Sequence, residues 1–225
     1  MKQPELSPIE CRIISVLVEK ELTTPASYPL TLNALVAGCN QKSNRHPVSS
    51  YGSDEIDQAL SLLTVKGWVA NTDVGGRMLK WTHRLGVRLE LEPGQVAVMA
   101  ELMMRGAQQP GELRSRVDRM HRVPDQAGLK ELLAALMRRD PALVVRVSPR
   151  SGERAERYRH TLAPMEEAAP QETERVSSPG IALPDADVME RLAMLETEVA
   201  ELKTALEELG WSGTAPDPER IEDPR

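Results

Sequence analysis

The chain has 225 residues, of which 40% are hydrophobic, enough to bury one or two apolar cores. Phe is absent and aromatic residues make up only 3%, so Leu, Val, Ile, Ala and Met must form most of any core. No apolar run approaches the roughly 18 residues that a membrane span needs, and the first residues lack the apolar stretch of a signal peptide. We therefore expect a cytoplasmic protein with reduced cysteines and no membrane contact.

The net charge of −6 is spread unevenly along the chain. Residues 1–88 carry a formal charge of +2, residues 89–163 of +3 and residues 164–225 of −11. Such asymmetry bears on binding partners rather than on the fold. The two basic blocks are candidates for contact with an anionic partner, and the acidic segment would compete with that partner.

The first block predicts three helices and a hairpin. Ser7-Pro8-Ile9-Glu10 combines a capping hydroxyl, a proline at the first helical position and a glutamate that can reach back, so a helix should begin here and run to about Glu21. Further helices are predicted over residues 30–39 and 54–66. Strand-like runs at 68–70 and 77–82 flank a glycine-containing turn. This is the element order of a winged helix-turn-helix.

The second block repeats that order. Helices are predicted over residues 93–105, 111–120 and 126–139, followed by strands at 143–147 and 154–159. The two hairpins match at a constant offset of 77 residues, as with Trp81 and Tyr158 or His83 and His160. A fixed register of this kind indicates duplication of one unit. We therefore predict a mainly α, α+β fold with two tandem winged-helix domains, at residues 1–88 and 89–163.

The acidic C-terminal segment has three predicted parts. Residues 164–184 are rich in Pro, Glu and Ser and favour a disordered linker, and residues 211–225 favour a disordered acidic tail. Residues 185–210 have apolar side chains at alternating spacings of four and three, which is a coiled-coil heptad. The heptad predicts a homodimer, although the same stripe could instead pack on its own chain. Its candidate dimerisation residues are Val188, Leu192, Leu195, Val199, Leu202, Leu206 and Leu209.

Three segments resemble a known family. They are "VEKELTTPASYPLTLNALVAGCNQKSNRHPV" from Val18, "RGAQQPGELRSRVDRM" from Arg105 and "RAERYRH" from Arg154. These are similar to signature segments of the YceH-like family of uncharacterised bacterial proteins, and the resemblance covers about residues 5–163. It implies a pair of winged-helix domains, and it brings no activity, ligand or catalytic residue.

The usual signatures of catalysis are missing from the sequence. No phosphate-binding glycine loop, zinc-protease motif, nucleophile elbow or C-x-x-C pair occurs, so we expect no enzyme, no cofactor and no metal site. Cys39 lies near Lys42 and Arg45, which could lower its pKa and make it redox-sensitive. The more favoured interpretation is a small buried residue at a helix end.

The distribution of basic residues favours DNA contact outside the third helices. Winged domains usually insert the third helix into the major groove, but here the third helices begin with Asp54-Glu55 and Asp125, which repel phosphates. Arginine and lysine lie instead on the second helices, the wings and the loop 40–53, where they are expected to project. The candidate nucleic-acid-binding residues are Lys42, Arg45, Arg77, Lys80, Arg114, Arg116, Arg119, Arg154 and Arg157.

The leading hypothesis is a double-stranded DNA-binding regulator or nucleoid-associated protein that contacts mainly the phosphate backbone. The alternative is a protein-interaction module that uses winged domains without binding DNA. Acidic third helices and a weak net charge allow this alternative. If Arg45, Arg77, Arg116, Arg119 and Arg154 converge on one face, the DNA hypothesis gains support.

Overall fold

The structure is a computed structural model that describes residues 6–73, 79–149, 152 and 155–164. The described residues form a mixed α/β fold, consistent with the predicted α+β class, with two small antiparallel hairpins. The elements of the first half are α1 (Pro8–Thr23), a 3₁₀ turn (Pro25–Ser27), α2 (Leu32–Cys39), α3 (Ser53–Val65), β1 (Val69–Asp73), β2 (Leu79–His83) and α4 (Leu85–Leu89). Those of the second half are α5 (Pro93–Arg105), α6 (Pro110–Val117), α7 (Gln126–Met137), β3 (Val144–Val147) and β4 (Arg157–His160).

The start of α1 follows the predicted cap. The Ser7 hydroxyl accepts a hydrogen bond from the Glu10 backbone N–H, and the Glu10 carboxylate accepts one from the Ser7 N–H at 2.8 Å. These reciprocal bonds satisfy two backbone donors that a helix start leaves open. The short helix α4 and the 3₁₀ turn were not predicted, because segments of three to five residues show no periodicity.

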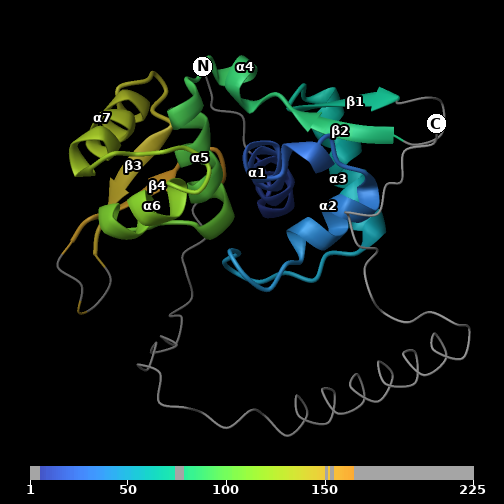
Figure 1. Cartoon of the computed structure of the whole chain (residues 1–225), viewed down its shortest axis with the longest axis horizontal. Helices are drawn as coiled ribbons and strands as arrows, with labels where there is room; N and C mark the ends of the chain where they lie inside the picture. The colour runs from blue at the N-terminus through green and yellow to red at the C-terminus, as the bar shows by residue number, and fades with distance from the viewer. Residues whose placement is uncertain (1–5, 74–78, 150–151, 153–154, 165–225) are drawn as a thin grey trace, which may run out of the picture. The chain divides into compact units, whose positions relative to one another are not determined.

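Helices α1 and α5 form the centre of the molecule. Every residue from Glu10 to Glu19 in α1 is buried, and so is every residue from Val96 to Met104 in α5. The two helices pack against each other, with α2, α3 and the first hairpin on one side and α6, α7 and the second hairpin on the other (Figure 1). Helix α1 is buried around its whole circumference over this stretch, because both halves cover it.

Both halves share one apolar core within one compact unit. Buried residues of both halves, from Leu6 to Leu162, belong to a single cluster, and all described residues fall in the unit spanning residues 1–167. The backbone N–H of Leu6 donates to the carbonyl of Leu162 at 2.7 Å, which joins the two ends of this unit. The division into domains at residues 88 and 89 stays a prediction.

The two hairpins have matching environments. β1 pairs with β2 and β3 pairs with β4, both antiparallel. The outer edge of β2 forms an additional bridge between Trp81 and Leu30, and β4 forms one between Tyr158 and Gln108. Trp81 and Tyr158 are the pair that the 77-residue offset had aligned, so the repeat is visible in the backbone pairing as well as in the sequence.

The predicted linker, heptad helix and acidic tail lie outside the described residues. The same holds for the turn between β1 and β2. Within the part of the chain that the structure describes, no helix has the length and apolar character needed to span a bilayer.

Gly38 in α2 provides a test of the close packing against α1. A Cβ atom at Gly38 would lie 2.8 Å from Cγ1 of Val16, a stiff side chain in the core. We predict that Gly38→Ala lowers the free energy of unfolding by about 1 to 3 kcal/mol in urea denaturation. The control is Gly111→Ala in α6, where a Cβ meets no atom within 4 Å. That variant should gain about 0.5 to 1 kcal/mol. A Gly38→Ala protein as stable as the wild type would contradict this packing.

Candidate nucleic-acid interface

The predicted contact residues differ in how exposed they are in the structure and in whether they form ion pairs. Arg77 and Arg154 lie outside the described residues, so the convergence of the five named arginines can be followed only for Arg45, Arg116 and Arg119. Lys42 is exposed on the loop between α2 and α3, and Lys80 is partly exposed on β2. Neither lysine forms an ion pair with a described residue.

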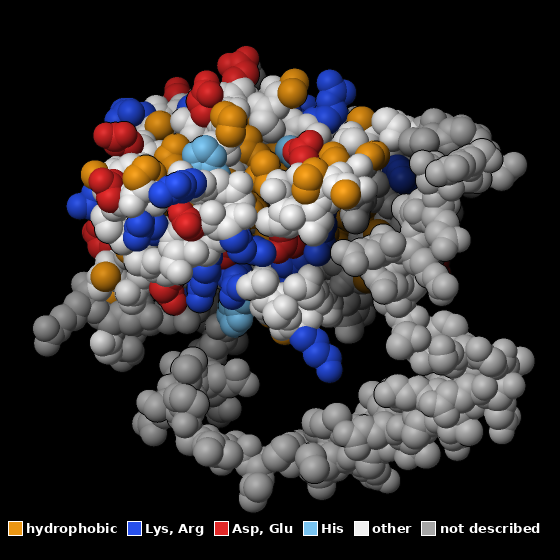
Figure 2. Space-filling model, viewed as in Figure 1, with side chains coloured by type: hydrophobic (Ala, Val, Ile, Leu, Met, Phe, Trp, Pro, Cys, Tyr) orange, Lys and Arg blue, Asp and Glu red, His pale blue; other side chains and the backbone are white. Residues whose placement is uncertain are grey.

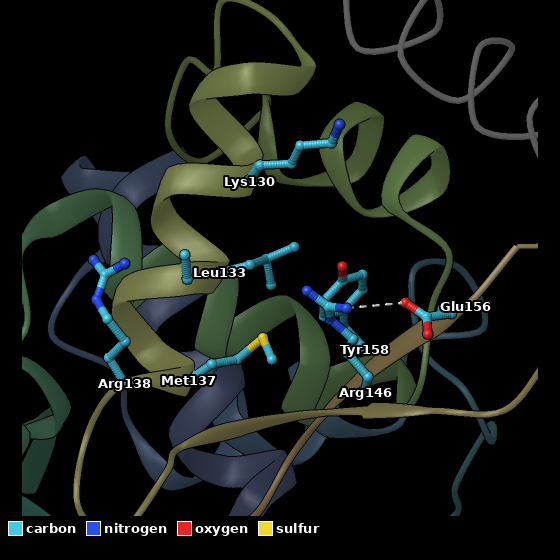
Figure 3. Close-up of a pocket in the computed structure, with 8 residues that line it drawn as sticks. Lys130, Leu133, Met137, Arg138, Arg146, Glu156 and Tyr158 are labelled. Atoms are coloured by element: carbon cyan, nitrogen blue, oxygen red, sulfur yellow. Dashed lines mark hydrogen bonds and ion pairs between the residues drawn. The ribbon is translucent and has the colours of Figure 1, made fainter.

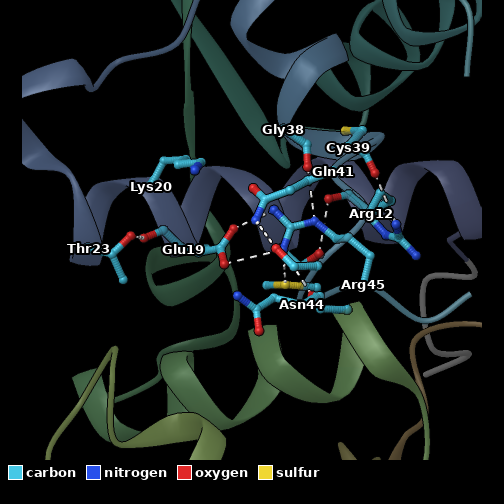
Figure 4. A network of polar contacts seen from close by, with 12 residues as sticks. Arg12, Glu19, Lys20, Thr23, Gly38, Cys39, Gln41, Asn44 and Arg45 are labelled. Carbon is cyan, nitrogen blue, oxygen red and sulfur yellow. Dashed lines mark hydrogen bonds and ion pairs between the residues drawn. The ribbon is translucent and has the colours of Figure 1, made fainter. Parts of the chain in front are cut away.

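Arg45 does not project from its loop as expected. Its side chain has an exposed fraction of 0%, and Nη2 lies 2.5 Å from the carboxylate of Glu19 in α1. Its Nε donates to the Gly38 carbonyl at 2.9 Å. Burial of a guanidinium requires such a full set of acceptors. The prediction of a projecting, phosphate-contacting Arg45 is therefore wrong, and the residue ties the loop to α1 (Figure 4).

Arg119 joins the two halves through the same carboxylate. It follows α6 by two residues, and its Nη1 lies 2.5 Å from Oε1 of Glu19. Its Nη2 lies 3.4 Å from Oε2 of Glu101, a fully buried residue of α5. Glu101 also lies 3.0 Å from Nε of Arg105, although this ion pair is too poorly aligned to form a hydrogen bond. Arginines and glutamates thus alternate in a chain from the loop through α1 to α5.

Arg116 extends this chain along α6. Its Nη1 donates to the side-chain carbonyl of Gln108 at 2.7 Å, and the amide of Gln108 donates to the backbone carbonyl of Glu101. Arg116 also pairs with Glu112 at 3.6 Å across one turn of α6. Of the five arginines named for convergence, Arg45, Arg116 and Arg119 therefore do lie in one network.

The loop between α2 and α3 is held by side chains from three directions. Arg12 of α1 donates to the carbonyls of Cys39 at 3.0 Å and Pro47 at 2.7 Å. Arg105 of α5 donates to Oδ1 of Asn44 at 2.6 Å. Within the loop, Asn40 exchanges two hydrogen bonds with the Tyr51 backbone at 2.8 Å each. Lys42 therefore extends from an ordered loop.

Arg114 and Arg157 are engaged with the backbone. Arg114 donates to the carbonyls of Val123 and Pro124, which secures the segment after α6. Arg157 donates to the carbonyl of Ala107, and it is half-buried. Local anchoring is the observed role of both, and a phosphate contact by either stays a prediction.

The two buried carboxylates, Glu19 and Glu101, have pKa values shifted in opposite directions. Burial alone would raise the pKa of Glu19, but hydrogen bonds and charges from Arg45 and Arg119 outweigh it, so the pKa lies below its ordinary value. For Glu101, burial dominates over the attraction of Arg105 and Arg119, and it raises the pKa. Glu19 is thus the firmly ionised centre of the network.

We call this network the arginine seam, and it carries excess positive charge. It contains five guanidinium groups and three carboxylates, and the arginines with the most exposed side chains are Arg116 at 34% and Arg119 at 30%. On the face seen in Figure 2, Lys and Arg side chains gather below the centre with acidic side chains among them. The seam consists of Arg12, Glu19, Arg45, Glu101, Arg105, Gln108, Glu112, Arg116 and Arg119.

Sequence reasoning missed Arg12, Glu19, Glu101 and Arg105. A signal was present, since Arg12 and Glu19 are seven residues apart on one face of a helix whose other residues are largely apolar. Glu101 and Arg105 form a similar pair four residues apart in an apolar helix. Charges within such helices predict buried ion pairs.

The other candidate chemistries find little support in the structure. Cys39 is fully buried, and burial raises its pKa to about 12, so the reactive thiolate does not form near neutral pH. This burial favours the interpretation of Cys39 as a small buried residue at a helix end, and redox sensing at Cys39 stays an untested hypothesis. Across the described segments, no three His, Cys, Asp or Glu side chains are grouped to hold a metal ion. The candidate dimerisation residues from Val188 to Leu209 lie outside the described residues.

We predict that Glu19→Gln destabilises the protein by about 3 kcal/mol, because it leaves Arg45 and Arg119 without their shared carboxylate. The control is Glu112→Gln, which removes a partly exposed pair and should change stability by about 0.5 kcal/mol or less. Urea denaturation measures both. A Glu19→Gln protein within about 0.5 kcal/mol of the wild type would show that the seam does not hold the halves together.

The same variant has a defined pH dependence. Because the pKa of Glu19 is lower in the folded chain than its ordinary 4.5, its stabilisation is complete well above pH 4.5 and is lost as the pH falls towards the folded pKa. Glu19→Gln should therefore lose less stability than the wild type when the pH is lowered through this range.

Comparison with known proteins places the chain in a family. Residues 6–153 match the family model described as "Protein of unknown function, DUF480". The UPF0502 protein of Geotalea uraniireducens (strain Rf4) is 45% identical over 196 residues, which cover 87% of this chain and 89% of the relative. The UPF0502 protein of Serratia proteamaculans (strain 568) is 39% identical over 216 residues, which cover 93% of this chain and 98% of the relative. The chain belongs to the DUF480 (UPF0502) family of uncharacterised bacterial proteins.

Proposed function

We propose that this chain binds double-stranded DNA through its phosphate backbone, without catalysis, as a regulator or nucleoid-associated protein of the cytoplasm. The observation that carries the proposal is the arginine seam, in which Arg116 and Arg119 remain partly exposed at a site of excess positive charge. Lys42 extends from the loop that the seam holds in place.

The chemistry of these groups suits phosphate. A guanidinium presents a planar fork of donors that can hold two phosphate oxygens at once. Arg119 pairs with one carboxylate through Nη1 and with another through Nη2, while 30% of its side chain stays exposed. A phosphate that approaches the seam would meet a surplus of two positive charges in surroundings that are partly shielded from water, where electrostatic attraction is stronger.

The order of elements supports a winged-helix interpretation of both halves. Three helices precede each hairpin, and each hairpin receives a third short strand-like contact, from Leu30 in the first half and Gln108 in the second. In such domains the third helix usually reads bases. Here α3 begins with the exposed acids Asp54 and Glu55, so we propose modest base readout and mainly backbone contact.

The proposal predicts a salt-dependent affinity that depends on two named cations. Lys42→Ala and Arg116→Ala should each weaken binding of a labelled duplex of about 30 base pairs by roughly fivefold and reduce the salt slope by about one. Fluorescence anisotropy between about 50 and 200 mM salt measures both quantities. Each variant removes one phosphate contact, so the loss should not depend on the DNA sequence.

The matched control is Arg138→Ala, which removes an exposed cation that directly follows α7 and lies outside the seam. Its affinity and salt slope should equal those of the wild type. Two results would refute the proposal: no binding of any duplex at low salt, or equal weakening by all three variants, which would indicate attraction by net charge alone.

A second candidate function is protein docking through α3. Leu62 and Val65 lie three residues apart on this helix with exposed fractions of 56% and 88%. Apolar side chains so exposed on neighbouring turns, together with the acids at the helix start, favour a protein partner over DNA at this helix. Recovery of one stoichiometric protein after nuclease treatment, lost in Val65→Glu, would support this function.

A further inference from the structure

A second feature of the molecule lies in the second half, between α7 and the hairpin β3–β4. Here the side chains of Leu133, Met137 and Tyr158 face a common space, a partly open groove of about 470 Å³ (Figure 3). Leu133 belongs to the buried core, and Met137 and Tyr158 pack against that core. The floor of the groove is therefore apolar and rigidly supported.

The rim of the groove is basic. Lys130 lies on α7 and Arg138 directly follows that helix. Both are exposed, and neither forms an ion pair with any residue in the described ranges. Arg146 stands on the hairpin side, where it pairs with Glu156 at 3.4 Å. Both partners of this pair are more than half exposed, so it contributes little and Arg146 can readily exchange its partner.

The spacing of these groups indicates the shape of a ligand. Lys130 lies in α7 and Arg138 directly follows the last residue of that helix, so the helical rise separates their Cα atoms by about 12 Å along the axis. Long lysine and arginine side chains can converge on one small anion, but such an anion would leave the apolar floor of the groove uncovered. A second helix laid along the groove suits both the cations and the floor, because acids seven or eight residues apart on one face span a similar distance. Between those acids, two apolar side chains would enter the space above Leu133 and Met137.

We propose that this groove binds an acidic amphipathic helix of a partner protein. The apolar face of that helix covers Leu133, Met137 and Tyr158, and its flanking carboxylates pair with Lys130, Arg138 and Arg146. This is the helix-in-groove mode of recognition, in which apolar anchors supply affinity and charge supplies register. The site shares no residue with the arginine seam, so peptide binding and DNA binding can be tested separately.

The test is a selection from a phage-displayed library of helical peptides on the full-length protein, with depletion on the double variant Lys130→Glu, Arg138→Glu. Enriched sequences should carry acids seven or eight residues apart that flank two apolar residues. By anisotropy, a labelled enriched peptide should bind the wild type at least tenfold more tightly than the double variant. Both substituted residues are exposed, so the thermal midpoint should remain unchanged.

The matched control is Lys42→Ala, which removes a cation from the other half and should leave peptide affinity within twofold of the wild type. The proposal is overturned if no sequence is enriched, if the enriched peptides are basic, or if they bind the double variant equally. Displacement of the peptide by duplex DNA would also overturn it, since the groove would then belong to the DNA interface. Failure of DNA binding in the wild type leaves this test unaffected.

Discussion

The pairing of Glu19 is the interaction on which the rest of the structure depends. It lies at the end of the fully buried stretch of α1, and its carboxylate pairs with Arg45 from the loop and with Arg119 from the second half. An unpaired carboxylate at this depth would cost several kcal/mol. The two arginines therefore fix the loop, α1 and the segment after α6 relative to one another, and they place the remaining arginines of the seam side by side.

This constraint explains why the loop between α2 and α3 is long and polar. A shorter turn could connect two helices, but it could not bring Arg45 to Glu19, Asn44 to Arg105 and the Pro47 carbonyl to Arg12. The loop contributes acceptors and one cation to the seam while it leaves Lys42 in solvent. The same loop therefore holds two kinds of side chain. Arg45 and Asn44 fix the loop to the helices, and Lys42 is the candidate phosphate contact.

The ends of helices could be predicted from the sequence because neighbouring residues determine them. Ion pairs between residues far apart in the chain could not be predicted. α5 begins and ends at the predicted residues, Pro93 and Arg105. A proline at the first helical position marks its start, and Gly106 directly after Arg105 marks its end. Arg45 was expected in solvent because arginine is seldom buried without a partner, and its partner stands 26 residues earlier in the chain. The arginines of the seam likewise come together because α1 packs against α5. The spacing of apolar residues within one helix does not predict which other helix it will contact.

The most direct test of the central claim is an NMR titration that follows the side-chain Nε–Hε signals of the arginines as duplex DNA is added to the full-length protein. Assignment by single Arg→Lys variants identifies each signal. The signals of Arg116 and Arg119 should shift in a salt-dependent manner, while that of buried Arg45 should stay in place. Shifts confined to arginines outside the seam, or no shift at a saturating DNA concentration, would contradict it.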